Sequence, residues 1–142
     1  MRQAAGALAT LAAAAGLAFA TTGTAYADAY GAQPFGGGEV PGAGEVPSGV
    51  LEHQITGSGL TVDDQWAEFE SVAPVCNWEI EFHYIDAYNT TYHVDEGTLN
   101  PGCAAIGNRT GHQPGTALQT GAACAVLKYN GTEVARQCHS LF

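Results

Sequence analysis

The chain has 142 residues and is strongly acidic, because 14 Asp and Glu residues stand against four Lys and Arg residues and give a formal net charge of −10 with the histidines neutral. Nucleic acids and anionic lipids both bind through basic surfaces, so this charge argues against either as a partner. It is compatible with a basic partner, with cation binding, or with solubility alone, and solubility is the commonest of these reasons.

Residues 1–27 have the three parts of a secretory signal peptide. Arg2 supplies a positive start, an apolar run covers residues 4–20, and Ala25-Tyr26-Ala27 matches the small-residue site cut by signal peptidase. The run is short for a membrane span and contains glycine, which favours cleavage over anchoring. We therefore expect a secreted protein that begins near Asp28, is not inserted in the membrane, and carries a net charge of −11 from 14 carboxylates and three cations.

Residues 28–49 are dominated by glycine and proline and contain the tetrapeptide GEVP twice. Such a segment has too little apolar surface to offset the entropy lost on ordering it. We interpret it as a flexible Gly/Pro-rich leader, and the duplication as too short to mark a structural repeat. Residues 50–142 then provide enough chain for one domain.

The first half of this domain alternates between apolar and polar residues, as strands with one buried face do. Residues 50–56 predict a strand, and Gly57-Ser58-Gly59 predicts a turn. Residues 60–72 fit either a strand or a helix, and the flanking glycines favour a strand. Trp66 in this segment is interpreted as a core residue, although an outward position would suit it for stacking on a sugar or anchoring a partner.

The stretch CNWEIEFHYID, residues 76–86, alternates most clearly and predicts a strand that turns at residues 88–90 into a second strand at residues 91–95. If Ala87 faces Thr91, the apolar faces of the two strands agree. This register places His83 opposite Asp95 and brings Cys76 opposite the residue before Cys103.

The same register gathers polar side chains on the other face of this hairpin, namely Glu79, Glu81, His83, His93 and Asp95. Histidines and carboxylates in one cross-strand neighbourhood could hold a divalent metal, with Glu81, His83, His93 and Asp95 as the weak candidates. The simpler interpretation, which we favour, is that they form the solvated face of an antiparallel sheet. No metal or cofactor is therefore expected.

Catalysis finds little support in the sequence. No G-x-S-x-G motif is present, and the carboxylate pairs Asp63-Asp64 and Asp95-Glu96 are adjacent, so that on a strand they point to opposite faces. We expect a protein that is not an enzyme.

Residues 97–121 are rich in Gly, Thr, Asn and Pro and predict a long loop held by Cys103. A hairpin follows, with Asn130-Gly131 at its tip. A two-residue turn would pair Tyr129 with Thr132 and leave Cys124 and Cys138 on opposite faces. A three-residue loop would pair Lys128 with Thr132 and put both cysteines on one face, and we favour it because it permits a disulfide.

An even number of cysteines in a short exported chain indicates a disulfide framework, and the spacings of zinc sites are missing. Four cysteines allow three connectivities. We favour Cys76–Cys103 and Cys124–Cys138, each of which closes the base of a predicted hairpin.

The segments CNWEIEFHYID, Gly102-Cys103, ACAVLKYNG and Gln137-Cys138-His139 resemble a group of uncharacterised small four-cysteine proteins secreted by actinomycetes. The resemblance implies a secreted, disulfide-bonded β domain and assigns no functional residues. We expect a mainly antiparallel all-β fold, either a small sandwich or a barrel with long loops.

Three functions are compatible with this sequence. The favoured one is a small secreted non-enzymatic binding or envelope-associated protein whose partner is another protein or a cell-wall glycan. The second is a proteinaceous inhibitor acting through the predicted loop at residues 104–121, and here the size, export and two disulfides resemble small secreted inhibitors of subtilisin-like proteases. The third is a small metal-dependent enzyme.

Overall fold

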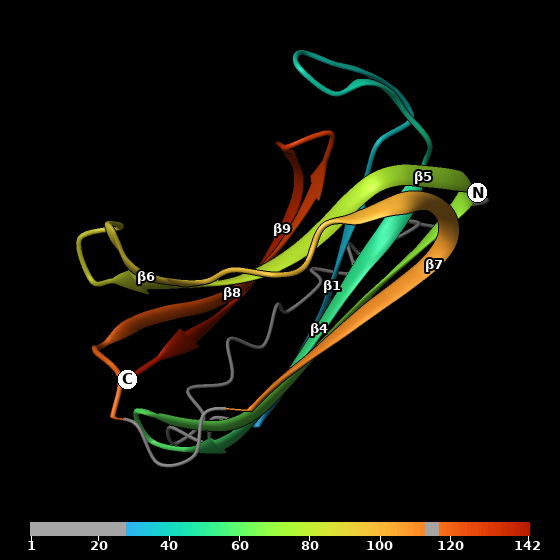
Figure 1. Ribbon diagram of the computed structural model, residues 1–142. Coiled ribbons are helices and arrows are strands. Elements are labelled where there is room, and N and C mark those ends of the chain that lie inside the picture. Colours follow the sequence, from blue (N-terminus) through green and yellow to red (C-terminus); the bar gives the residue numbers. More distant parts are fainter. Residues whose placement is uncertain (1–27, 113–116) are drawn as a thin grey trace, which may run out of the picture.

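The computed structural model describes residues 28–112 and 117–142, and these residues form an all-β structure (Figure 1). The predicted signal peptide, residues 1–27, lies outside the described residues, as do residues 113–116 of the predicted loop. The described strands are β1 (Ala29–Phe35), β2 (Gly38–Val40), β3 (Gly44–Val46), β4 (Gly49–Ser58), β5 (Thr61–Asp86), β6 (Thr91–Asp95), β7 (Asn100–His112), β8 (Gly121–Tyr129) and β9 (Thr132–Leu141). Over these same residues, no helix has the length and apolar character needed to cross a membrane.

One antiparallel sheet contains seven of the described strands, in the order β1-β4-β5-β8-β9, with β6 and β7 also paired to β5. The 26-residue β5 runs through the whole sheet: its first half lies between β4 and β7, and its second half pairs with β8 and β6. Register shifts on both sides of Val75 mark where β5 bends. The sheet curls strongly, so that β1 comes to lie beside β9 (Figure 1).

This arrangement confirms the expected antiparallel all-β fold class. The strand interpretation of residues 60–72 is also confirmed, and the helix alternative is wrong. Residues 60–72 and 76–86, expected as two strands, belong to the single strand β5.

The core lies on the inner, concave face of the curled sheet. Its largest members come from distant parts of the chain, with Leu51 on β4, Phe69 and Phe82 on β5, and Leu127 on β8 all buried. Each such side chain contributes about 1.5–3 kcal/mol through its removal from water. A second buried cluster, around Ile55 and Tyr84, extends the core toward the other end of the sheet.

The predicted flexible leader is wrong, because most of residues 28–49 is in strands. β1 pairs with β4 along its whole length, from Ala29 opposite Ile55 to Phe35 opposite Gly49. The two GEVP copies form the β2–β3 hairpin, in which Glu39 lies opposite Glu45. Backbone pairing along the free edge of β4, together with burial of Phe35 and Val46, offsets the entropy that the composition alone suggested could not be recovered.

The predicted long loop at residues 97–121 is wrong over residues 100–112, which form β7 and pair with β5. Gly107 and Gly111 reflect close packing in a strand. A Cβ atom on Gly107 would lie 2.5 Å from Cε1 of Phe69 and 2.7 Å from Cη2 of Trp78, so only glycine fits there.

Both predicted disulfides are confirmed, and each joins directly opposed residues on neighbouring strands. The Cα atoms are 3.9 Å apart in Cys76–Cys103 and 4.0 Å apart in Cys124–Cys138. The favoured three-residue loop of the last hairpin is wrong, because Tyr129 pairs with Thr132 around a two-residue turn. A bulge at Val134 shifts the register by one residue and so brings Cys138 opposite Cys124.

Candidate functional site

The predicted hairpin at residues 76–95 forms, but with a register that differs by one residue. Tyr84 faces His93 and Phe82 faces Asp95, whereas Thr91 faces Ile85, so Tyr92 is an additional, bulged residue. A shift of one residue moves every side chain to the opposite face of a sheet. The expected grouping of Glu81 and His83 with His93 and Asp95 is therefore wrong, since the two pairs lie on opposite faces.

Glu81 and His83 belong to an ionic network on β5, β8 and β9. The buried carboxylate of Glu81 accepts from Lys128 Nζ at 2.6 Å and lies 2.7 Å from His83 Nε2. Arg136 approaches His83 Nδ1 at 3.5 Å and pairs with Glu133 at 2.7 Å. Burial would raise the pKa of Glu81, but the hydrogen bonds from Lys128 and His83 outweigh it and hold that pKa below its ordinary value.

His93 and Asp95 are engaged separately. The ring of His93 stacks on Tyr84 with centroids 5.5 Å apart. Asp95 pairs with Arg109 at 2.8 Å, and the Arg109 guanidinium also donates to the Ile80 carbonyl and lies 4.7 Å from the centroid of the Phe82 ring. Among residues 28–112 and 117–142, no three His, Cys, Asp or Glu side chains are arranged to hold a metal ion.

A second polar cluster is buried on the inner face. The ring Nε2 of His53 lies 3.3 Å from Gln65 Oε1, and Gln65 Nε2 donates to the Tyr84 hydroxyl at 2.6 Å. His139 on β9 donates to the His53 carbonyl at 2.9 Å and so links β9 to β4. Burial, helped by the neighbouring His139, lowers the pKa of His53 to about 4, and burial raises the pKa of Tyr84 to about 12. These hydrogen bonds cross-link the interior, although Nδ1 of His53 is buried without a hydrogen-bond partner in the described residues.

The opposite side of the same strands is open. We call the outward-facing residues of β1, β4, β5 and β7 the outer face, and their registers align them in three rows across the sheet. The rows are Tyr30-Gln54-Trp66-Thr110, Ala32-Glu52-Glu68-Asn108 and Pro34-Val50-Glu70-Ile106.

Aromatic and aliphatic side chains are exposed on this outer face. Tyr30 is 60% exposed and Ile106 is 56% exposed. Trp66 is half-buried and lies outside both core clusters, so the core interpretation of this residue is wrong. Its neighbours Gln65 and Ala67 face the core instead. Tyr88, at the tip of the β5–β6 hairpin, is 90% exposed and lies outside these rows.

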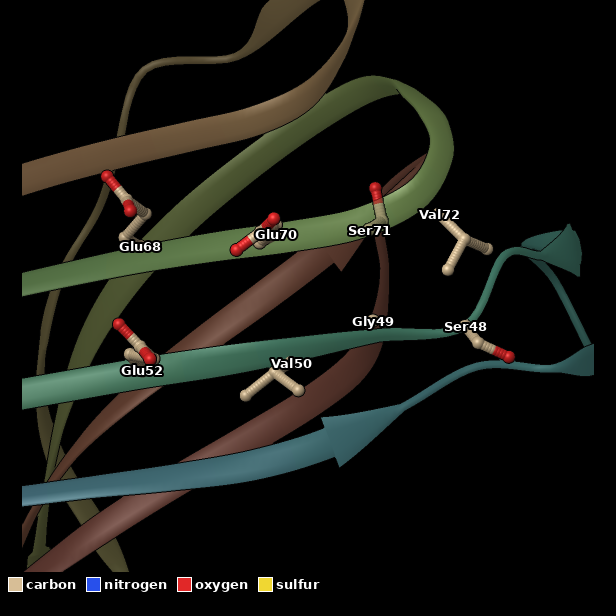
Figure 2. A pocket seen from close by; sticks show the side chains of 8 residues that line it. All are labelled: Ser48, Gly49, Val50, Glu52, Glu68, Glu70, Ser71 and Val72. Carbon is tan, nitrogen blue, oxygen red and sulfur yellow. The ribbon is translucent and has the colours of Figure 1, made fainter.

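A hollow of about 490 Å³ lies where β4 and β5 meet at one end of the outer face, within the range of about 300–1,000 Å³ that ligand pockets occupy. Figure 2 shows Glu52, Glu68 and Glu70 carried side by side on the two strands that line it. The complete lining is Ser48, Gly49, Val50, Glu52, Glu68, Glu70, Ser71 and Val72.

These carboxylates form no ion pair within the described part of the chain. The three cations of residues 28–142 pair elsewhere: Arg109 with Asp95, Lys128 with Glu81, and Arg136 with Glu133. Glu52 lies directly opposite Glu68. The Glu52 carboxylate also accepts a hydrogen bond from the Tyr30 hydroxyl, which raises the pKa of Tyr30.

A scan of protein-family models and searches of the curated proteins and of the solved structures found no match to this chain. The outer face was not predicted from the sequence because two of its strands, β1 and β7, have the glycine-rich composition of a flexible leader and a loop. The alternation of Val50, Glu52 and Gln54 with buried residues was the one available signal.

Proposed function

We propose that this chain is an exported, non-enzymatic binding protein that holds a macromolecular partner, another protein or a cell-wall glycan, on its outer face. One observation carries the proposal: three carboxylates without an ion pair in the described residues adjoin exposed Tyr30, Val50 and Ile106 on one open sheet surface. An apolar patch edged by polar groups is typical of an interaction surface.

The groups that could have performed chemistry support a binding role instead. Glu81 uses both carboxylate oxygens on Lys128 and His83, and the buried histidine His53 is enclosed in the core. An inhibitory loop at residues 104–121 loses its basis, because residues 104–112 are paired in β7. The metal-dependent enzyme loses its basis too, because Glu81 and His83 lie on the opposite face of the sheet from His93 and Asp95.

Two features support export. The sequence of residues 1–27 has the pattern of a cleaved signal peptide, and both disulfides are of the kind that persists in oxidising compartments. N-terminal sequencing of protein recovered from the culture medium is expected to begin at Asp28. Recovery of uncleaved chain from the membrane would contradict export.

Binding is tested with the immobilised mature chain, residues 28–142, incubated with culture medium and with washed cell walls. The variant pair is Tyr30→Ala with Trp66→Ala on the outer face, and the matched control is Tyr88→Ala at the hairpin tip. We expect a partner that the wild type and the control retain and that the outer-face variant loses. Equal retention by all three proteins would rule out the outer face as the binding surface.

A further inference from the structure

The charge on the outer face is arranged against the stability of the sheet. Glu52 and Glu68 are directly opposed on β4 and β5, and Glu70 follows two residues along β5. Like charges in directly opposed positions destabilise an antiparallel pair. Fold stability therefore gives no reason for this arrangement, whereas a partner of opposite charge would.

No cation among the described residues serves this role. Each of the three cations in residues 28–142 is committed to a different carboxylate, and Arg109 lies on the inner face against Phe82. A protein countercharge for these carboxylates would therefore come from another molecule. A neutral glycan supplies none, and a nucleic acid adds more negative charge.

The residues around the carboxylates indicate which kind of positively charged group would fit there. Val50 and the 83% exposed Val72 border the same hollow as Glu52, Glu68 and Glu70 (Figure 2). Long basic side chains bury an aliphatic stem against apolar surface while their charged ends reach polar groups. Alternate residues of a strand lie about 6.6–6.8 Å apart, so Glu68 and Glu70 match the spacing of alternate residues in an extended peptide.

We propose that the partner on the outer face is a cationic protein segment, bound extended over β4 and β5 with Lys or Arg residues at alternate positions. This rests on the proposed function above and specifies its partner. The basic ends pair with Glu52, Glu68 and Glu70, and the stems lie on Val50 and Val72.

The test measures binding of a fluorescent alternating Lys-Val octapeptide to the mature chain, with the corresponding Glu-Val octapeptide for comparison. The triple variant E52Q/E68Q/E70Q removes the three carboxylates of the hollow. The control E39Q/D63N/E96Q removes the same amount of charge from exposed carboxylates elsewhere that are not directly opposed to one another. We expect the wild type to bind the Lys-Val peptide and not the Glu-Val peptide. The affinity of E52Q/E68Q/E70Q for the Lys-Val peptide should be at least about tenfold lower than that of the wild type. The control should stay within about twofold of the wild type, because distant exposed charges are screened.

Equal weakening in both triple variants would show attraction to net charge only and would overturn the proposal. Failure of the peptide to bind would do the same. If wall glycan fragments bind instead, and Trp66→Ala abolishes that binding while E52Q/E68Q/E70Q leaves it intact, the cationic partner is wrong and the binding function stands. If neither peptide nor glycan depends on the outer face, both proposals fail.

Discussion

Single residues in the interior tie this protein's stability to pH, and His53 is the clearest example. It is fully buried between Gln65, Phe82 and His139, in an environment that keeps the ring neutral. Its folded-state pKa of about 4 lies below the ordinary value of 6.5. The unfolded chain therefore binds a proton at a pH where the folded chain does not, and acid favours unfolding.

The stability contributed by a neutral His53 is fully present above about pH 6.5 and is lost as the pH falls toward 4. From these two values we expect the free energy of unfolding to drop by about 2 kcal/mol between pH 7 and pH 5, measured by urea denaturation. His53→Gln keeps a hydrogen-bonding side chain without a titrating ring and should remove most of this drop. His112→Gln, at an exposed position, should not, and an unchanged pH dependence in His53→Gln would contradict the assignment.

Gly107 in β7 lets the side chains of Phe69 and Trp78 pack directly against the backbone of this strand. We expect Gly107→Ala to lower the free energy of unfolding by about 1–3 kcal/mol, because the added methyl group meets Phe69 and Trp78. Gly102→Ala, in the same strand, has open space around the new Cβ atom and should change stability by less than about 0.5 kcal/mol. Thermal unfolding of the two variants decides this, and equal melting temperatures would show that the core yields freely around Gly107.

At the scale of elements, the hairpin tips differ in how they are tied to the rest of the fold. Asn130, at the tip of β8–β9, has a positive φ of 49° and accepts a side-chain hydrogen bond from Asn77 at 2.9 Å. Its own amide donates to the Ala43 carbonyl of the β2–β3 hairpin at 3.3 Å. Asn89, at the tip of β5–β6, also has a positive φ, of 64°, but its side chain makes no hydrogen bond within the described residues.

Substitution by glycine separates these side-chain bonds from backbone strain, since glycine adopts a positive φ readily. We expect Asn130→Gly to destabilise the protein by about 1–2 kcal/mol, because the hydrogen bonds to Asn77 of β5 and to the Ala43 carbonyl of the β2–β3 turn are lost. Asn89→Gly should be neutral within about 0.5 kcal/mol. Chemical denaturation of both variants measures the difference. A neutral Asn130→Gly would mean that the tip does not stabilise the β2–β3 hairpin.

Alternation in residues 50–56 and 76–86 was sufficient to predict strands. The predicted hairpin bases favoured the correct pair of disulfides among the three connectivities, although the loop assumed for the last hairpin was wrong. Registers were not predictable, because single bulged residues, Tyr92 and Val134, shift them by one. The bulge at Tyr92 brings that side chain against the second core cluster, and its hydroxyl accepts from the Gln119 amide, a long-range contact that local periodicity cannot reveal.

The outer face was also not predictable from the sequence, because it depends on contacts between distant parts of the chain. Glycine and proline in residues 28–49 indicate a chain that cannot order itself, and it is ordered only because β4 offers a free edge. Trp66 was assigned to the core on residue type alone, whereas its phase relative to Gln65 and Ala67 places it outside. The acidic composition was visible from the start, but the pairing of all three cations elsewhere depends on the fold.

At the scale of the whole molecule, the two disulfides reinforce neighbouring strands within a single sheet. Cys76–Cys103 spans 27 residues of sequence and Cys124–Cys138 spans 14. Chain-entropy estimates give each bridge about 3–4 kcal/mol, with the longer loop contributing slightly more. This is a large share of the roughly 5–15 kcal/mol that holds a typical domain folded.

We therefore expect thiol reduction to unfold residues 28–142 near ambient temperature. Replacement of either cysteine pair by alanine should lower the free energy of unfolding by about 3 kcal/mol. Circular dichroism melts with and without reductant measure both effects. A reduced protein that melted as high as the oxidised one would show that the small core suffices without the bridges.

The first and last described strands, β1 and β9, lie beside each other, yet the described strands show no backbone pairing between them. Neither disulfide joins β1 to β9. Under tension applied at both ends, we expect β1 to peel away from β4 first while β8 and β9 stay covalently joined, an order of events that force spectroscopy can record. Peeling would carry Tyr30 away from Trp66 and dismantle the outer face, so a mechanical load would release whatever is held there.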